Sequence, residues 1–462
     1  MATAYKVKVS ASDTGLLKFK QDEATAQKVS DLLQQDLERH HVFFNASGFH
    51  DHIVHQLLTL YGTGASAQHL QKAYDDNSSY MKPAQATHDS VLEELRAGWH
   101  EAAPKYLGKG NHYPDFLAFF QREIETRGFE EVLLEYVFKG DEVAESVYAR
   151  LFAGILHPII QLLFGLEWSQ PAIIASALAQ TCVHKDNLRD FLTKAETLAR
   201  ADEGNQPPAA ASSPTMLSLY EELRLPENEK LARSARFTDE LHISGGVFAR
   251  AYEEAARFAS RIRVDEAALE ERTAEMVHAS ALVAAAAAWK PPHEPKYDFF
   301  LIHHLTSAPV FLTFNKYPWL PQSSKARLLE WKLRLDAIEY IARGCPALDA
   351  SILSAYVPRD DSQRQDGAQR PEVSDPEDLL PRVHGMHDDG HIVKVARSLL
   401  IAREASRGYE DKAWHVIKEG DYARMMHMLL DGATGSGGVW VRSAGFDEAW
   451  KDIPNITWKV RL

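Results

Sequence analysis

Cysteine is scarce in this chain of 462 residues, which contains only Cys182 and Cys345. Two thiols exclude a disulfide framework and a zinc site built from cysteines, and they suit a reducing compartment. The amino-terminal residues 1–8 also lack the apolar core of a signal peptide. We therefore expect a cytoplasmic protein.

Basic charge is in deficit as well, because the formal net charge is −14. Binding to phosphate backbones or anionic lipid requires a basic surface, so we expect neither nucleic acid nor membrane as a partner. The longest apolar run, residues 151–166, is interrupted by His157, Pro158 and Gln161 and is too short to span a bilayer. It is predicted to be a buried helix.

Nucleotide-binding and nucleophile motifs are absent too. The sequence contains no Walker A loop, no Rossmann glycine fingerprint and no Gly-x-Ser-x-Gly elbow. This absence disfavours a flavin or nicotinamide held tightly in a Rossmann domain.

Helical periodicity is the main pattern that is present. Apolar residues make up 45% of the chain and charged residues 25%, as in a globular protein. They recur at helical spacing in segments such as 22–40 and 328–343. The sequence predicts a predominantly α fold, one large multi-helix domain over residues 1–462 with the active site between core helices. Polar stretches rich in proline and glycine predict flexible loops at 201–215 and 358–381.

Histidine is abundant, with 21 copies, and it falls in four apolar settings: residues 50–55, 157, 303–304 and 387–391. One histidine in an apolar helix is more often a hydrogen-bonded core residue than a ligand. Four such segments in one helical chain favour a metal centre, because helical bundles build metal sites from inward side chains on different helices. Imidazole ligands suit Fe, Zn, Cu or Ni.

Two of these segments are predicted to carry their histidines on one helix face. Residues 49–61 place His52, His55 and Gln56 together, and residues 387–394 place His387, His391 and Lys394 together. In the segment 151–168, Pro158 either kinks the helix or begins a new one at its first turn.

Lys394 has two interpretations. Burial beside a cation lowers the pKa of an amine, and a neutral amine can take up carbon dioxide to form a carbamate, which is an oxygen ligand. The alternative is a surface lysine one turn away from the site.

Four blocks of the chain, in this order, resemble the questin oxidase family of fungal polyketide-pathway oxygenases, which includes an oxidoreductase of aflatoxin biosynthesis. Together they are specific, although none is specific alone, and the resemblance extends over nearly the whole chain. The blocks are residues 50–66, 156–168, 297–307 and 388–397.

The resemblance implies an α-helical oxygenase that opens the quinone ring of an anthraquinone such as questin. It implies Fe(II) held by four histidines and a carboxylated lysine. Carried over motif by motif, the metal ligands are His52, His157, His303, His391 and Lys394. His387 is expected to orient a ligand through a hydrogen bond, and His55, His304 or His387 could each replace one of these ligands. The chain departs from the family at Gln161, where members often have a second histidine.

The expected reaction joins a small aromatic polyketide with dioxygen at the open position of the iron. Dioxygenation and a Baeyer–Villiger-like monooxygenation with NADPH as external reductant are both open. The alternative function is a metal-dependent hydrolase, in which Asp388 or Asp389 would be the base. His-Asp pairs at 50–51 and 387–388 resemble part of the pattern of helical metal phosphohydrolases.

Overall fold

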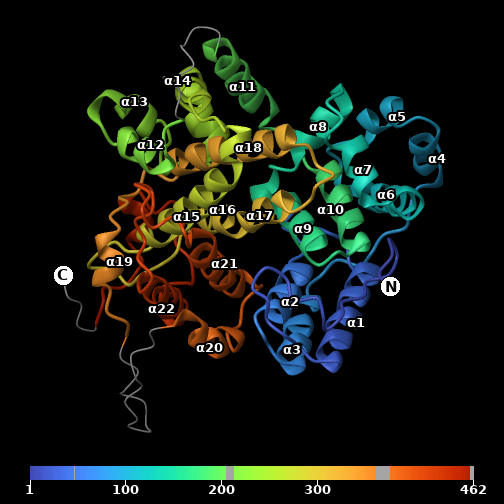
Figure 1. The fold of residues 1–462 in the computed structure, drawn as a ribbon, viewed down its shortest axis with the longest axis horizontal. Helices are drawn as coiled ribbons and strands as arrows, with labels where there is room; N and C mark the ends of the chain where they lie inside the picture. The colour runs from blue at the N-terminus through green and yellow to red at the C-terminus, as the bar shows by residue number, and fades with distance from the viewer. Residues whose placement is uncertain (46, 204–212, 360–374, 458–462) are drawn as a thin grey trace. The chain divides into compact units, whose positions relative to one another are not determined.

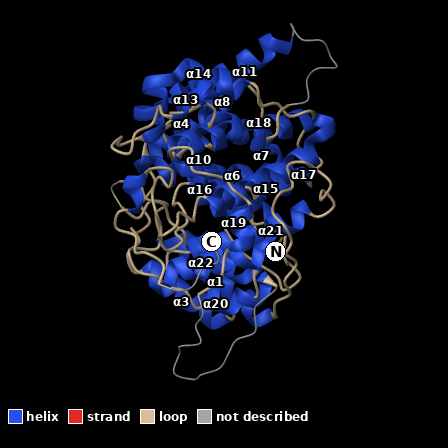
Figure 2. Cartoon of the chain, turned by 90° about the vertical axis from the view of Figure 1, so that its left-hand side faces the viewer, coloured by secondary structure: helices blue, strands red, loops and turns tan. Residues whose placement is uncertain are grey.

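The computed structural model describes residues 1–45, 47–203, 213–359 and 375–457. Helices make up most of these residues, and the only β-pairing among them consists of isolated bridges (Figures 1 and 2). The predicted, predominantly α fold is therefore confirmed. The extent of one domain over residues 1–462 stays a prediction.

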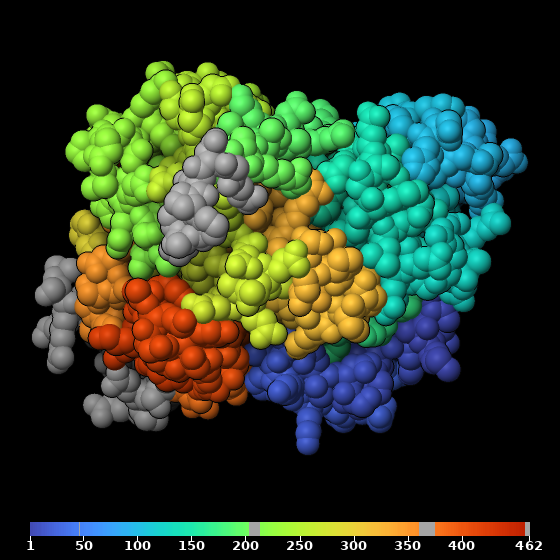
Figure 3. Space-filling model, turned by 45° about the horizontal axis from the view of Figure 1, so that its top comes forward, coloured from blue at the N-terminus to red at the C-terminus, as the bar shows by residue number. Residues whose placement is uncertain are grey.

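The helices pack into two compact units, each assembled from three stretches of chain. Unit 1 comprises Met1–Arg189, Pro309–Ser324 and His384–Arg397. Unit 2 comprises Asp190–Ala308, Lys325–Val383 and Ser398–Leu462. In the space-filling view, the first helices (blue) and the helices that follow them (cyan) form part of the surface of unit 1 (Figure 3).

Unit 1 contains most of the helices from the first half of the chain. They are α1 (Glu23–Arg39), α2 (Ile53–Gly62), α3 (Ala67–Ser78), α4 (Asp89–Ala97), α5 (Trp99–Tyr106), α6 (Tyr113–Arg127), α7 (Phe129–Tyr136), α8 (Glu142–Arg150), α9 (His157–Glu167), α10 (Pro171–Val183), α17 (Pro309–Asn315) and the first residues of α21 (His391–Ser406).

Unit 2 contains the remaining helices. They are α12 (Met216–Leu223), α13 (Glu229–Ala232), α14 (Phe248–Ser260), α15 (Leu269–Ala286), α16 (Leu301–Ser307), α19 (Ser351–Ala355), α22 (Asp421–Thr434), the rest of α21, and all but the first or last residues of α11 (Arg189–Glu203), α18 (Gln322–Ala342) and α20 (Leu380–His384). Short helical turns are η1 (Gly110–His112), η2 (Gly154–Leu156), η3 (Pro226–Asn228), η4 (His242–Val247), η5 (Glu266–Ala268), η7 (Pro376–Leu379) and η8 (Asp447–Trp450).

Helix α9 is the core of unit 1. All its residues from His157 to Leu166 are buried, and it packs against α2, α10 and α17. A helix that is apolar on all sides is stable only in such a central position. Gly165 lets α10 approach closely, because a Cβ atom there would lie 2.8 Å from the backbone nitrogen of Ile174.

Of the two alternatives predicted for Pro158 in the segment 151–168, the structure shows the second, a new helix that begins next to the proline. Helix α8 ends at Arg150, and α9 begins at His157, so Pro158 lies in a first turn rather than at a kink. Gly154, Ile155 and Leu156 have φ values of 54°, 55° and 63°. This left-handed region is costly for residues with a Cβ atom, above all for β-branched isoleucine. The strained turn sets the position of His157.

Most of each predicted loop, at 204–212 and 360–374, lies outside the described residues. At the described margins, helix α11 extends to Glu203, and η7 and α20 cover residues 376–384. No single helix in the described ranges is long and apolar enough to cross a membrane. One bent pair, Glu142–Arg150 with Gly154–Glu167, passes the same criterion jointly, with 65° between its helices.

A buried ion pair connects α9 with α21. Arg397 Nη2 contacts both carboxylate oxygens of Glu167 at 2.5 Å, and the two side chains are each only 3% exposed. Glu167 Oε1 also accepts a hydrogen bond from the backbone N–H of Leu16 at 2.7 Å. Removing one partner of such a pair leaves an uncompensated buried charge.

We therefore expect Arg397→Met to lower the free energy of unfolding by about 3–5 kcal/mol, as measured by urea denaturation. The double variant Arg397→Met/Glu167→Leu, which removes both charges, should recover much of that loss. A single variant as stable as the wild type would contradict this account of the pair.

Candidate metal centre

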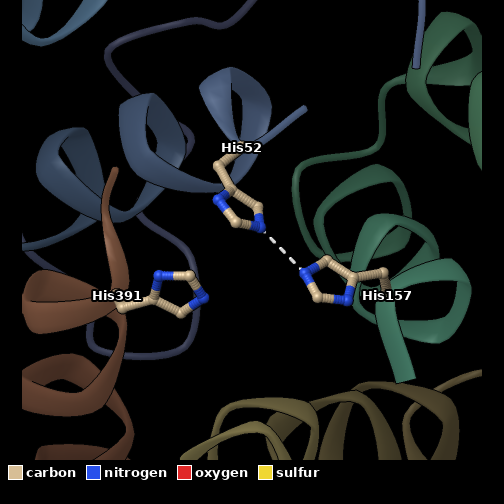
Figure 4. Close-up of side chains that lie close together, drawn as sticks. All are labelled: His52, His157 and His391. Atoms are coloured by element: carbon tan, nitrogen blue, oxygen red, sulfur yellow. Dashed lines mark hydrogen bonds between the residues drawn. The ribbon is translucent and has the colours of Figure 1, made fainter. Parts of the chain in front are cut away.

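Three histidines of unit 1 converge from the starts of three helices. His52 lies immediately before α2, His157 is the first residue of α9, and His391 is the first residue of α21 (Figure 4). One ring nitrogen from each lies within 4.8 Å of the others, and all three side chains are buried. Segments far apart in the sequence are therefore brought together by their helix starts.

Hydrogen bonds at Nδ1 set the tautomer of each ring. The Nδ1–H of His157 donates to the carbonyl oxygen of Gly154 at 2.7 Å. Asp389 accepts from the other two rings, with Oδ2 at 3.1 Å from His52 Nδ1 and Oδ1 at 2.5 Å from His391 Nδ1. A carbonyl or carboxylate oxygen can only accept, so each neutral ring carries its lone pair on Nε2.

The lone pairs of His52 and His157 face each other. Their Nε2 atoms are 2.8 Å apart (Figure 4), a contact that is repulsive between two neutral rings unless a cation or a proton lies against both. Nitrogen ligands at right angles around a metal, with bonds of about 2.1 Å, are themselves about 3 Å apart. The spacing fits two neighbouring ligands of one metal ion.

Burial favours the neutral state that metal binding requires. It lowers the pKa of His52 to about 3, assisted by the positive charge of Lys394. Burial also lowers the pKa of Lys394 to about 8, although Asp389 and Asp388 oppose this shift. A histidine ligand binds as the neutral imidazole, so desolvation prepares the site.

Two further polar groups lack partners near the histidines. Lys394 Nζ and both ring nitrogens of His55 are buried and make no hydrogen bond to any residue that the structure describes. The His55 ring lies 5.8 Å from the His52 ring, measured between centroids. Buried polar groups without partners are rare in proteins, so these atoms are consistent with an absent ligand. The residues present therefore fit a metal such as iron.

Asp389 is the residue that sequence reasoning assigned differently, because it was considered only as the base of a hydrolase. Its carboxylate instead bridges two imidazoles, the usual outer partner of a metal-bound histidine. The carboxylate of Asp388 is also occupied by hydrogen bonds. It accepts from the backbone N–H groups of Gly390 and Ile392 at 3.0 and 2.8 Å and so caps α21. Gly390 has φ = +92°, and a Cβ atom there would lie 2.6 Å from Gln56 Cβ.

The prediction of one helix face for His387, His391 and Lys394 was wrong. Helix α21 begins only at His391, because the capping turn 388–390 precedes it, so His387 lies outside the helix. The His387 side chain is 61% exposed, with Nδ1 at 3.1 Å from Asp76. The orienting contact expected of His387 is made by Asp389, whereas His391 and Lys394 share α21 as expected. A catalytic role for His387 stays a prediction, so His387 is not a suitable control for variants of the centre.

The prediction that His52, His55 and Gln56 share one helix face was also wrong in part. His52 immediately precedes α2, and only His55 and Gln56 lie within that helix.

Gln161, one turn after His157, is buried and donates from Nε2 to Ser176 Oγ at 3.2 Å. Its amide is thus held by α10.

His303 belongs to unit 2, on α16, and its role as a ligand stays a prediction. The ring is buried, and Nδ1–H donates to the carbonyl oxygen of Phe299 at 2.6 Å. Its neighbour His304 is engaged in an ion pair with Asp336. Of these two histidines, His303 carries its proton on Nδ1, as His52, His157 and His391 do.

A second histidine cluster in unit 1 is already satisfied. His88 Nδ1 and His112 Nδ1 both donate to Asp115 Oδ2, at 2.9 and 2.8 Å, while Asp115 Oδ1 accepts from the backbone N–H of His88. This buried carboxylate holds the start of α4 against that of α6, which accounts for the cluster structurally.

The known proteins that are similar to this chain match it over almost its whole length. The questin oxidase-like family matches residues 49–399, more than half of the chain. Questin oxidase of Aspergillus fumigatus is 32% identical, over 99% of this chain and 100% of that protein. The Baeyer–Villiger monooxygenase dmxR6 of Cryptosporiopsis is 35% identical, over 92% and 93%. The oxidoreductase AflY of Aspergillus parasiticus is 32% identical, over 98% and 94%.

The bridging carboxylate leads to a prediction about metal affinity. Asp389→Asn keeps the size of the side chain but places an N–H donor opposite one imidazole N–H, so we expect about 10- to 100-fold weaker binding of Fe(II). Competition with a chelator under anaerobic conditions measures this affinity. His100→Ala, which alters an exposed histidine of α5, is the matched control and should bind as the wild type does. Equal affinity in Asp389→Asn would rule out the orienting role.

Proposed function

The chain belongs to the questin oxidase-like family, and from that premise we propose that it is a non-haem iron oxygenase that cleaves the quinone ring of an anthraquinone with dioxygen. Its similarity to questin oxidases and Baeyer–Villiger oxidases makes it an oxidoreductase, an oxygenase of the type found in fungal polyketide metabolism. The questin-like substrate is proposed from the name of the relatives.

The convergence of three Nε2 lone pairs is the observation that best supports iron in this proposal. His52, His157 and His391 would hold the ion, with His303 and a carboxylated Lys394 as the further ligands that the family resemblance implies. Fe(II), when bound, would supply the activation of dioxygen that an organic side chain cannot provide.

The protein's own residues prepare and maintain this centre. Asp389 keeps the rings of His52 and His391 in the tautomer that presents Nε2, and the Gly154 carbonyl does the same for His157. Burial excludes water from the ring nitrogens and keeps the imidazoles neutral. The buried Lys394 amine would add carbon dioxide, forming an N–C bond and releasing one proton to water, to give a carbamate oxygen ligand.

Two reaction types remain within the proposal. The names of several relatives, Baeyer–Villiger monooxygenases and oxidases, favour insertion of one oxygen atom beside a quinone carbonyl. That reaction requires two electrons from an external reductant such as NADPH, whereas dioxygenation requires none.

We propose that the protein acts in the cytoplasm on a small aromatic polyketide.

The hydrolase alternative is weaker in the structure. A hydrolytic site requires a carboxylate that is available to accept a proton from water. Both oxygens of Asp389 accept from histidines, and both oxygens of Asp388 accept from the backbone of α21.

We expect His157→Ala to reduce oxygen uptake in the presence of questin by about 100-fold or more, because it removes an iron ligand. An oxygen electrode, with product analysis by mass spectrometry, measures the loss. His100→Ala should retain the wild-type rate. If folded His157→Ala consumed oxygen at the wild-type rate, the proposed centre would be wrong.

Carboxylation of Lys394 has its own signature. Protein equilibrated with 13C-labelled bicarbonate should show a carbamate carbon resonance that is absent from Lys394→Met, which is similar in length but has no amine. Lys325, a second buried lysine, serves as a control, and Lys325→Met should keep the resonance. A spectrum of the iron-free or zinc-substituted protein without that resonance would remove the carbamate from the ligand set.

A further inference from the structure

An aromatic cluster lies at the surface of unit 1, where the loop that leads into the metal centre meets Tyr80, two residues after the end of α3. Phe44 contacts Phe49 and Tyr80, with ring centroids 5.9 and 5.1 Å apart. Phe49 and Tyr80 are 49% and 44% exposed. We call Phe44, Phe49 and Tyr80 the aromatic lip. Large aromatic side chains left in water mark binding surfaces more often than single exposed residues do.

The backbone of this loop separates an outer face from an inner one. Phe43 and His50 form an isolated β-bridge, and the N–H of Phe44 donates to the carbonyl oxygen of Phe49 at 2.9 Å. Neighbouring residues in extended backbone point to opposite sides. Phe49 therefore faces solvent, while His50, next to it, is buried.

The inner face of the loop packs directly on the histidine cluster. Phe43 contacts the rings of His50 and His184, each at 5.4 Å between centroids. His50 then stacks on His157 at 3.8 Å, with an interplanar angle of 6°. Ring contacts therefore lead from Phe43, which precedes the lip residue Phe44 in the chain, through His50 to the proposed ligand His157.

A chain of hydrogen bonds joins the other side of the lip to the capping turn of α21. The Tyr80 hydroxyl donates to Asn77 Oδ1, and Asn77 Nδ2 donates to Gln56 Oε1 at 2.6 Å. Gln56 Nε2 donates to the carbonyl oxygen of Asp388 at 3.2 Å. Burial raises the pKa of the Tyr80 phenol, and the negative charge of Asp389 raises it further.

Asp389 is the part of the centre that reaches solvent. Its side chain is 38% exposed, whereas the three histidines and Lys394 are buried. Asp389 is therefore the exposed group of the centre, and the chain of hydrogen bonds from Tyr80 ends at Asp388, the residue before it.

We propose that the aromatic lip is a binding subsite for a planar, polycyclic aromatic molecule, the hydroxyanthraquinone substrate, whose ring face stacks on Phe49 and Tyr80. The proposal rests on the proposed function for the identity of the ligand. Stacking requires flat, apolar ring faces and no fixed hydrogen-bond pattern, so the subsite selects for planarity rather than for particular substituents.

The test measures equilibrium binding of questin to the iron-loaded protein in the absence of oxygen, with quenching of protein fluorescence as the signal. Phe49→Leu and Tyr80→Leu keep apolar bulk but remove the rings, and each should raise Kd by about 3- to 10-fold. Tyr80→Phe, which removes only the hydroxyl, should bind like the wild type. Tyr5→Leu removes a ring of similar exposure, 50%, elsewhere in unit 1 and should have no effect.

Iron content and kcat at saturating questin separate a subsite from a structural role. Both should stay within about twofold of the wild type in the lip variants, because Phe49 and Tyr80 contact none of the proposed metal ligands. Only KM for questin should rise. If the wild type binds and converts questin and both leucine variants bind it equally well, the lip proposal is overturned while the proposed function stands. If the wild type neither binds nor converts questin or another hydroxyanthraquinone, both fall together.

Discussion

The carboxylate of Asp389 is the contact on which the geometry of the centre depends. One oxygen accepts the Nδ1–H of His52 and the other accepts that of His391. This single group sets the tautomers of two rings from segments more than three hundred residues apart and turns both Nε2 atoms towards His157. Without it, either ring could rotate or place its proton on the nitrogen that a metal needs.

The backbone around the centre is built to make that arrangement possible, and at a cost in stability. Three consecutive residues with positive φ bring His157 to the start of α9, where the Gly154 carbonyl receives its proton. At α21, Gly390 takes a left-handed conformation beside Gln56, and Asp388 caps the helix so that His391 is its first residue. Strained backbone and buried polar atoms without partners occur together here, as is common where a protein gives up stability for function.

The sequence predicted the α class, the burial of α9 and the four histidine-bearing segments, because apolar periodicity and composition are local properties. It did not predict where α9 and α21 begin. Pro158 allows either a kink or a first turn, and the capping turn at 388–390 is recognisable only from the hydrogen bonds of Asp388. The orienting contact was assigned to His387 rather than to Asp389 for that reason, because a helix extended back to His387 would have placed it beside His391. The ligand set came from the family resemblance, and His303, in unit 2, still depends on it.

The central claim is that the Nε2 atoms of His52, His157 and His391 bind one iron ion. X-ray absorption at the iron K-edge of the purified protein, compared with His157→Ala, tests it most directly. The account predicts iron with a first shell of nitrogen and oxygen, with multiple-scattering features from at least three imidazoles that weaken in the variant. Iron without imidazole scattering, or an identical spectrum in folded His157→Ala that retains iron, would contradict it.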